Sequence, residues 1–418
     1  MVLMDLPMLR FYYQSICLIH LWILWLRGGI FRHFSRKLCI EKNMALCRLV
    51  PLPAIIVVLL RTVSVFTNSR FLGLIAGVVF SSITGCIIFQ GDANGSKLVF
   101  SGAGLSARSE RTLIAEGWPL PRYDFTQNPI DPEMVALGRK LFYDVRLSSD
   151  GRVSCGSCHS SYTAFAHVDH PRSHGVLDRE GRRNAPALMN LAWQSEFMWD
   201  GAIKHLDLQS LAPLTHRTEM NMSIDSILAF LKNDPGYQRA FGKREIGIPN
   251  MLKAFAQFEM TLISRNSRYD SMKRKQVVFT DQELRGYQLF QKNCAVCHSE
   301  PLFSKPGTFA HNGLQMDSIL RDKGRAEISS NPADDFLFKI PSLRNVEVTY
   351  PYMHDGRMKT LTEVVKYYSD QTLELPKTLG GGQKTIRLDS KERVDVVAFL
   401  MTLTDPDFLQ NPSFQEPR

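Results

Sequence analysis

The chain has 418 residues, of which 44% are hydrophobic and 22% charged, and its formal net charge is +9 at pH 7. Residues 1–95 hold nine Lys and Arg against three Asp and Glu, so +6 of that charge belongs to this segment and +3 to the rest. Such a small excess over the rest of the chain excludes the basic footprint of a nucleic-acid-binding protein. The composition indicates a globular body behind an apolar, basic N-terminal segment.

The N-terminal segment, residues 1–91, is expected to be a signal or membrane-anchor region. Of its apolar runs, only 71–89 approaches the length needed to span a bilayer, and it follows a positive flank. The run ends in "SSITGCIIF", which resembles a lipoprotein signal with Cys86 as the lipidated residue. An uncleaved membrane anchor that buries Cys86 is the equal alternative. The long stretch before the run favours a true start near Met44.

After a linker expected at 92–128, which is rich in Gly, Ser and Pro, the sequence is long enough for two domains. "GRKLF" at 138–142 and "GYQLF" at 286–290 share Gly-x-x-Leu-Phe and form a weak internal repeat. We therefore expect one domain at 129–275, a second at 276–405 and a tail at 406–418.

Both copies of the repeat are predicted to lie on helices. Asp131 is expected to cap a helix that begins at Pro132, and Thr280 with Glu283 forms a capping box at the start of the second. Further helices are expected at about 250–264 and 390–404, the last one burying Val394, Val397, Phe399 and Leu403. Strand signals are sparse, so the predicted fold class is mostly α, with long loops.

Two pentapeptides of the form Cys-x-x-Cys-His, "CGSCH" at 155–159 and "CAVCH" at 294–298, predict the cofactor. Two thiols at this spacing can bond to the two vinyl groups of one porphyrin, and the adjoining histidine can ligate its iron. Each motif is therefore predicted to attach one haem c covalently, through Cys155, Cys158 and His159 and through Cys294, Cys297 and His298.

Two other interpretations of the motifs are weaker. Zinc sites with four cysteines place their pairs about 15–20 residues apart, whereas 139 residues (294 minus 155) separate these pairs, and zinc needs no following histidine. A redox-active Cys-x-x-Cys also gives no reason for a histidine at the next position twice. The four other cysteines all lie within the first 86 residues, so none remains after Cys86 to form a disulfide.

Residues from about 129 to 405 resemble the bacterial di-haem cytochrome c peroxidases and their MauG-like relatives. The matching segments are "LGRKLFYDVRLSSDGRVSCGSCH", "RRNAPALMNLAW", "FMWDG", "LAPLTHRTEM", "IPSLRNVEVTYPYMHDG" and "TLTEVVKYY", in the family's order. The resemblance implies two cytochrome c-like helical domains, one covalent haem c in each, and a calcium ion between them.

The resemblance also implies roles for individual residues. Glu219 matches the distal acid of the first haem, where a carboxyl group can move a proton from the near to the far oxygen of peroxide. Gln209 and Pro213 match its pocket neighbours, and Trp199 matches the tryptophan between the two haems. The residues that match the calcium site offer one side-chain and two backbone oxygens, the donors that a hard cation prefers: Asn184, Thr349 and Pro351.

The second haem needs an axial ligand opposite His298. At the position where the peroxidase branch has methionine, this chain has Tyr368, as in the MauG-like branch. Thr360 and Glu363 cap the expected helix, and Tyr368 falls on its apolar stripe with Leu361, Val364 and Val365. Met353 and Met358 are the rival ligands. A phenolate is a hard anionic donor and favours oxidised iron, whereas a thioether raises the potential.

The sixth position of the first haem is left open by the sequence. His174 lies near the histidine that blocks this site in resting peroxidases, but only with gaps in the match, and His167 and His170 lie in the same loop. If His174 ligates the iron, the enzyme needs reductive activation. If it does not, peroxide binds at rest.

The function expected from these residues is reduction of hydrogen peroxide by electrons from a donor protein, a small c-type cytochrome or a cupredoxin. A MauG-like oxidase that modifies a partner protein is the related alternative, and a di-haem electron carrier without chemistry is the alternative of another class. Glu219 and Gln209 argue against the carrier, because electron transfer alone needs no distal acid. The sequence leaves open whether the protein is a homodimer.

Overall fold

The computed structural model describes residues 117–417. The expected N-terminal anchor, Met44, Cys86 and most of the expected linker therefore lie outside the described residues. The described residues all belong to the second of the two units into which the chain divides, residues 99–418. Within residues 117–417, no helix combines the length and the apolar character that crossing a bilayer requires.

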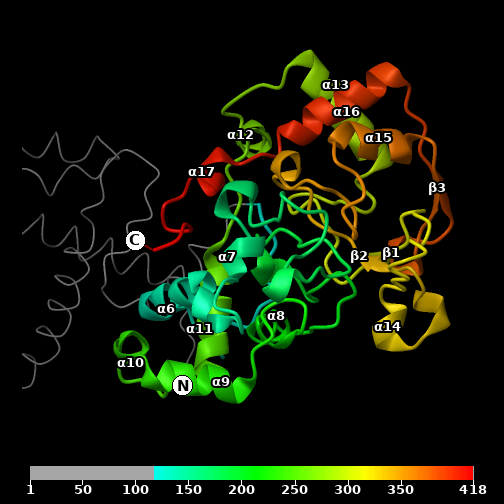
Figure 1. Cartoon of the computed structure of the whole chain (residues 1–418). Helices are drawn as coiled ribbons and strands as arrows, with labels where there is room; N and C mark the ends of the chain where they lie inside the picture. Colours follow the sequence, from blue (N-terminus) through cyan, green and yellow to red (C-terminus); the bar gives the residue numbers. More distant parts are fainter. Residues whose placement is uncertain (1–116, 418) are drawn as a thin grey trace, which may run out of the picture. The chain divides into compact units, whose positions relative to one another are not determined.

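The second unit consists of helices joined by long loops, as expected from the sparse strand signals (Figure 1). Two antiparallel strand pairs are the only named sheets among the described residues: β1 (Phe309–Ala310) with β2 (Phe338–Lys339), and β3 (Thr372–Glu374) with β4 (Gln383–Thr385). The α-helices are α6 (Pro132–Tyr143), α7 (Cys155–Cys158), α8 (Leu211–Thr215), α9 (Ile224–Asn233), α10 (Pro235–Phe241), α11 (Ile248–Thr261), α12 (Arg268–Lys273), α13 (Asp281–Asn293), α14 (Ala326–Ser329), α15 (Leu361–Ser369), α16 (Ser390–Met401) and α17 (Pro406–Leu409). The short 3₁₀ turns are η2 (Val145–Leu147), η3 (Ser161–Thr163), η4 (Val176–Asp178), η5 (Leu191–Trp193), η6 (Leu206–Leu208), η7 (Pro332–Asp334), η8 (Val346–Val348) and η9 (Lys377–Leu379).

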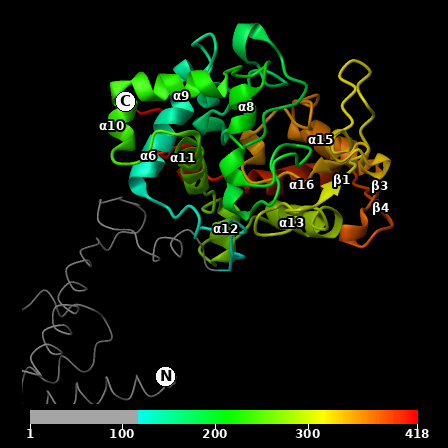
Figure 2. The same cartoon turned by 90° about the horizontal axis from the view of Figure 1, so that it is seen from below.

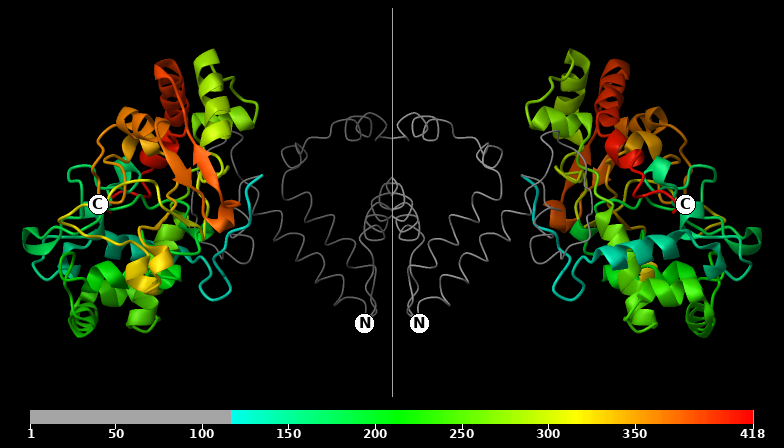
Figure 3. Two further views of the ribbon diagram at one scale, coloured as in Figure 1. Left: turned by 90° about the vertical axis from the view of Figure 1, so that its right-hand side faces the viewer. Right: turned by 90° about the vertical axis from the view of Figure 1, so that its left-hand side faces the viewer.

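Two hydrophobic cores divide these elements into halves. The first half contains α6 to α11, and the second contains α12 to α16. In each half two long helices pack against each other, α6 on α11 and α13 on α16, as Figures 1 and 2 show. Figure 3 shows α13 and α16 side by side from two further directions. Tyr269 of α12 belongs to the second core, so α12 lies on the far side of the boundary expected at 275.

Both helix pairs cross at a glycine, and the two crossings have the same geometry. A Cβ atom at Gly138 would lie 1.9 Å from the carbonyl oxygen of Ala254 and 2.9 Å from Cβ of Phe258. At Gly286 it would lie 1.9 Å from the carbonyl oxygen of Asp395 and 2.9 Å from Cβ of Phe399. The glycine of the Gly-x-x-Leu-Phe repeat is thus the residue that lets the two backbones touch.

Three phenylalanines fill the interior behind each crossing. In the first half, the ring of Phe142 lies 5.7 Å from that of Phe165 and 5.3 Å from that of Phe258. In the second half, the ring of Phe290 lies 5.7 Å from that of Phe303 and 5.0 Å from that of Phe399. Edge-to-face and tilted aromatic pairs of this kind add about 0.5–1.5 kcal/mol beyond the area that they bury.

The helix starts that the sequence predicts are confirmed. The predicted buried face of a helix is less accurate. Asp131 caps α6, whose second-half counterpart α13 begins at the capping box of Thr280 and Glu283. The expected face of α16 is wrong in part. Val394 is 57% exposed, and the helix buries Asp395, Val396, Phe399 and Leu400. The rotation is explained by Gly286, against which the backbone of Asp395 packs.

The C-terminal residues return to the first half. Phe408 and Phe414 lie in the first core, where their rings are 6.0 Å and 6.5 Å from that of Phe165. The hydroxyl of Tyr143 donates to the carbonyl of Phe414 at 2.5 Å. The segment expected to be a tail is therefore part of the first half's interior.

The start of the described chain is also packed. Trp118 lies 5.3 Å from Trp193 at 70°, and the guanidinium of Arg344 lies 4.7 Å over the Trp118 ring. The indole nitrogen of Trp193 donates to the carbonyl of Pro119 at 2.8 Å. This end of the expected linker therefore contributes to the folded body.

Candidate functional site

The two histidines of the Cys-x-x-Cys-His motifs are held in the same way. Nδ1 of His159 lies 2.6 Å from the carbonyl oxygen of Phe165, and Nδ1 of His298 lies 3.1 Å from that of Phe303. Burial lowers the pKa of each imidazole to about 4, so both are neutral at physiological pH. With Nδ1 held by a carbonyl, Nε2 is left as the metal-binding atom of each ring.

The cysteines of both motifs fit covalent haem attachment. Cys155, Cys158, Cys294 and Cys297 are all free thiols, partly buried beside their histidines. The two cysteines of the first motif lie on α7, a single turn of helix that follows α6, and the second motif follows directly after α13. Both constellations therefore have the donor set for one c-type haem, two vinyl-reactive thiols and one axial nitrogen.

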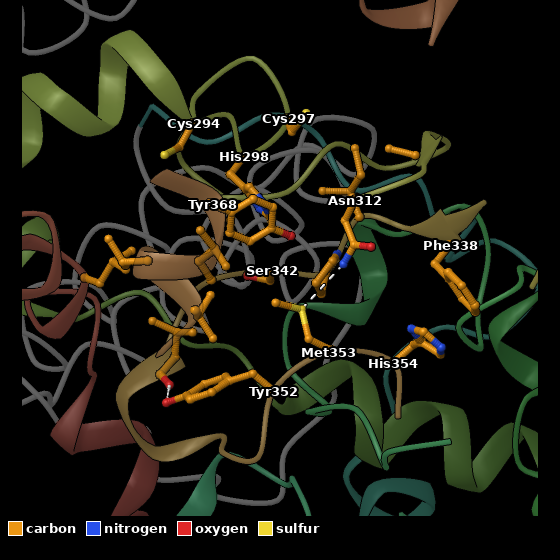
Figure 4. Close-up of a pocket in the computed structure, with 18 of the residues that line it drawn as sticks. Cys294, Cys297, His298, Asn312, Phe338, Ser342, Tyr352, Met353, His354 and Tyr368 are labelled. Carbon is orange, nitrogen blue, oxygen red and sulfur yellow. Dashed lines mark hydrogen bonds between the residues drawn. The ribbon is translucent and has the colours of Figure 1, made fainter. Parts of the chain in front are cut away.

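In the second half a deep cavity opens in front of His298, and Cys294 and Cys297 lie on its wall (Figure 4). Tyr368 points into this cavity from α15, together with the expected apolar stripe of that helix, Leu361, Val364 and Val365. The capping box of Thr360 and Glu363 at the start of α15 is also present.

Figure 4 draws Tyr368 and His298 in the cavity that both residues line. Burial raises the pKa of the Tyr368 phenol, and a hydrogen bond with the Asn312 side chain opposes that rise. Of the rival ligands, Met353 lines the cavity, with its sulfur 3.5 Å from Nδ2 of Asn312, whereas Met358 does not line it. The geometry thus brings Tyr368 and Met353 to the cavity opposite the attachment histidine.

In the first half, Glu219 lies close to the attachment cysteines. A charge on Glu219 raises the pKa of the Cys155 and Cys158 thiols, and the Cys158 thiol donates to the carbonyl of His174 at 3.5 Å. The backbone N–H of Val176 donates to the Glu219 carbonyl at 2.8 Å and fixes the two loops together. Burial raises the pKa of the Glu219 carboxyl, which favours its protonated form.

The expected neighbours of Glu219 lie on the segment that leads to it. Gln209 follows η6 and is partly buried, and Pro213 lies in α8. The carbonyl of Pro213 accepts from the N–H of Met220, which comes directly after Glu219. The turn from α8 to Glu219 is therefore fixed by the backbone.

Three histidines stack in the loop that passes Cys158. The rings of His170 and His174 are stacked 4.6 Å apart, and Nδ1 of His170 lies 3.4 Å from Nε2 of His167. Nε2 of His174 is 4.0 Å from the exposed carboxylate of Asp178. The backbone of His174 is thus beside the first haem motif, while its imidazole faces His170 and Asp178.

Trp199 lies on the wall of the second-half cavity, with the three residues expected to bind calcium: Asn184, Thr349 and Pro351. The indole nitrogen of Trp199 donates to the carbonyl of Asn184 at 2.8 Å, and the carbonyl of Trp199 accepts from the N–H of Lys339 at 2.7 Å. No group of three or more His, Cys, Asp or Glu side chains in residues 117–417 could hold a metal ion. The expected calcium site consists of one side-chain oxygen and two backbone carbonyl oxygens, so it differs in kind from a cluster of His, Cys, Asp or Glu side chains.

The sequence missed the ion network that positions Trp199. Arg183 donates to Asp200, the residue after Trp199, and its other two nitrogens donate to Asp322 at 2.6 Å and 2.8 Å. Asp200 and Asp322 are buried. Arg183 thus pairs with a residue that lies 139 positions after it in the sequence. The only sign of this network in the sequence is "WDG" at 199–201. Lys339 was missed as well: it lines the cavity, and burial lowers its pKa to about 8.

The fold and the two Cys-x-x-Cys-His sites define a class of protein, and comparison with known proteins agrees. The family model described as di-haem cytochrome c peroxidase matches residues 132–278, and the cytochrome c model matches 284–404. The chain belongs to the di-haem cytochrome c peroxidase and MauG family. It is an oxidoreductase of the cytochrome c peroxidase type, with two cytochrome c domains and two haem c groups.

Individual relatives come from both branches of the family. The methylamine utilization protein MauG of Methylorubrum extorquens is 36% identical over 309 residues, which cover 72% of this chain and 85% of that protein. The cytochrome c551 peroxidase of Nitrosomonas europaea is 33% identical over 294 residues, or 67% of this chain and 83% of that protein. A crystal structure of a MauG-like protein associated with microbial copper homeostasis superposes with a TM-score of 0.64 at 31% identity, covering 73% of this chain and 98% of that one.

Proposed function

We propose that this chain reduces hydrogen peroxide to water at the haem held by Cys155, Cys158 and His159. The observation that carries the proposal is the partly buried Glu219 carboxyl beside the two attachment cysteines. A carboxyl group whose pKa is raised in such a place can supply the proton that the leaving oxygen needs when peroxide is cleaved. A haem that only carries electrons has no use for it.

When bound, the haem supplies an iron that exchanges electrons with peroxide. The residues of the chain do the rest. His159 holds its neutral Nε2 toward the iron while the carbonyl of Phe165 fixes the ring. Glu219 moves a proton from the near to the far oxygen of peroxide, and that oxygen leaves as water. Over the whole reaction, one peroxide takes up two protons and two electrons and gives two water molecules.

The electrons are proposed to come from a donor protein, a small c-type cytochrome or a cupredoxin, through the second haem on His298. Trp199 lies on the wall of the second-half cavity and belongs to the first half, so it is proposed to conduct between the two haems. One calcium ion is proposed at Asn184, Thr349 and Pro351, where it would hold that segment near Trp199. His174 is proposed as a removable ligand of the first haem, which its backbone contact with Cys158 supports.

The protein is proposed to work in the periplasm of a bacterium, where c-type haems are attached and where its electron donors are found. Anchoring by residues 71–89 or by lipid on Cys86 stays a prediction that concerns residues outside the described part of the chain.

A second function, the MauG-like alternative of peroxide-driven oxidation of a partner protein, is favoured by one observation. Tyr368 faces the cavity in front of His298. A phenolate ligand stabilises oxidised iron, so that the second haem would store oxidising equivalents instead of supplying electrons at high potential. The Tyr368→Met variant tests this assignment: the potential of the second haem should rise clearly. Unchanged potentials would refute Tyr368 as the ligand.

The experiment that separates the two functions from an electron carrier is stopped-flow mixing of the purified holoprotein with hydrogen peroxide, with and without prior reduction by one electron. Reaction only after reduction supports the peroxidase with His174 as a removable ligand. Reaction of the fully oxidised protein supports the MauG-like oxidase. Two low-spin haems that ignore peroxide in both states would overturn both enzyme functions.

A further inference from the structure

Glu259, on α11 of the first half, is a buried carboxyl group that the proposed reaction does not use. Its side chain is 3% exposed, and among the described residues Oε2 is one of the few buried side-chain atoms without a hydrogen-bond partner. An ionised carboxylate in such a place loses its hydration without compensation. Burial accordingly raises the pKa of Glu259 to about 8.

The internal symmetry of the fold shows where Glu259 points. The glycine crossings match Ala254 with Asp395 and Phe258 with Phe399, at the same distances in both halves. The residue after each phenylalanine is therefore equivalent too, and Glu259 corresponds to Leu400 of α16. Leu400 lines the cavity in front of His298, together with Cys294. By this correspondence Glu259 faces the haem site of the first half.

The electrostatics of the cysteines support the same placement. A charge on Glu259 is the largest influence after burial on the pKa of the Cys155 thiol, and it raises that pKa. Cys155 itself packs against the first core, to which α11 contributes most of its length. The carboxyl group is therefore within electrostatic reach of the first haem's attachment point.

The other groups around Glu259 do not neutralise it. Asp207, from η6, acts on it with a negative field and raises its pKa further. Cys155, from α7, is a neutral thiol before attachment. From α6 the groups against this part of α11 are Gly138 and Phe142, which carry no charge. The two cations of α6 have other partners: Arg139 donates to the carbonyls of Gln415 and Pro412, and Lys140 lies 4.4 Å over the ring of Tyr237. The described groups that shift the pKa of Glu259 include no cation.

We propose that Glu259 is the proton acceptor that accompanies reduction of the first haem in solution alkaline enough to ionise its carboxyl group: the carboxylate then binds a proton from solvent when that haem gains an electron from the donor, and releases the proton when the electron leaves. The reason is Coulombic, because an added negative charge a short distance away in a buried site disfavours a carboxylate. Leu400 cannot do this, so the coupling belongs to the first haem alone. The inference rests on the proposed haem at His159 and is independent of how peroxide reacts there.

The test is a spectroelectrochemical titration of the holoprotein over a range of pH, without peroxide. In the native protein the potential of the first haem should fall with pH above the pKa that Glu259 has in the oxidised state. Full coupling of one proton to one electron corresponds to 59 mV for each tenfold change in proton concentration. In Glu259→Gln and in Glu259→Leu, which copies the second half, this dependence should vanish. The second haem is the internal control, and its pH dependence should be the same in all three proteins.

A pH dependence of the first haem that survives in Glu259→Gln would overturn the proposal, as would a native protein whose first-haem potential does not change with pH. Should the variants fail to fold, reduced-minus-oxidised infrared spectra of the native protein with ¹³C-labelled glutamate decide. A labelled carboxylic acid band must gain intensity on reduction and persist in Glu219→Gln. Absence of that band, or its loss in Glu219→Gln, refutes the role of Glu259. Failure of the peroxide reaction would leave these measurements unaffected, so the two proposals fail separately.

Discussion

The two halves of this protein use one frame for two different interiors. Each half has a helix crossing at glycine and three phenylalanines behind that crossing. In each half the backbone carbonyl of one of these phenylalanines, Phe165 or Phe303, holds the attachment histidine. What differs is what faces the haem site. The second half presents Leu400, Tyr368 and an apolar stripe to its cavity, whereas in the first half the carboxyls of Glu219 and Glu259 act electrostatically on the attachment cysteine Cys155.

The difference extends to hydrogen bonding. Among residues 117–417, the buried side-chain oxygens without a partner all belong to the first half: Gln194, Ser210 and Glu259. Buried polar atoms in a native protein are normally paired, so unpaired ones mark a place where water, substrate or a cofactor group is bound. The unpaired buried oxygens therefore distinguish the first half, where the proton transfer by Glu219 is proposed, from the second half.

The largest effect is expected when one haem is removed at a time, which tests whether the two halves have different roles. In the Cys155→Ser/Cys158→Ser protein the covalent haem content should halve and reaction with peroxide should be lost. The Cys294→Ser/Cys297→Ser protein should also lose one haem but keep its peroxide-reactive first site after chemical reduction. Pyridine haemochrome absorbance of the denatured proteins and stopped-flow mixing measure both effects. Full peroxide reactivity in the first protein would show that the halves have been assigned the wrong way round.

Glu219→Gln should slow the reaction with peroxide by about 10²–10⁴-fold, the usual contribution of a general acid–base group. The side chain keeps its shape but can no longer carry the proton. The second-order rate constant for peroxide is the measurement, and the haem spectra should stay as in the native protein. Glu180→Gln, an exposed carboxyl on the neighbouring loop, is the matched control and should react at the native rate. Equal rates for the two variants would remove Glu219 from the chemistry.

Phe408→Ala should destabilise the first half by about 3–5 kcal/mol, the usual cost of truncating a buried phenylalanine. Phe408 is 2% exposed and packs on Phe165, whose carbonyl holds His159. Denaturant unfolding followed at the two haem absorbances should show an earlier transition for the first haem. Phe279→Ala, in the second core, is the reciprocal variant and should move the second haem's transition instead. Transitions that shift together in both proteins would mean that the halves unfold as one unit.

The smallest expected effect comes from substitutions at the two glycine crossings, and it tests directly whether the two crossings are equivalent. Gly138→Ala and Gly286→Ala each place a methyl group 1.9 Å from a backbone carbonyl oxygen, so each should cost about 1–3 kcal/mol of overpacking. Because the two crossings have the same geometry, the two losses should be alike. Unfolding midpoints of the two variants provide the measurement. A clear difference between them would show that the shared frame is not mechanically equivalent in the two halves.

The features that the sequence predicted correctly depend on neighbouring residues. The capping boxes at Thr280 and Thr360 and the cap at Asp131 each act within four residues, so their chemistry is visible in the chain itself. The Cys-x-x-Cys-His motifs are local as well, because the three side chains of each motif must reach the same porphyrin. The apolar stripe that carries Tyr368 follows from helical periodicity alone.

The features that the sequence could not predict depend on segments that are far apart along the chain. Pattern alone placed Val394 inside, but the close contact of Gly286 with the backbone of Asp395 sets the rotation of α16 and leaves Val394 exposed. Phe414 enters the core of the other half, and Arg183 pairs with both Asp200 and Asp322, the second of them 139 positions further along the chain. The role proposed for Glu259 depends on where Leu400 lies in the second half. Local chemistry is fixed by covalent neighbours, whereas which distant groups meet is decided only when the whole chain packs its apolar surface.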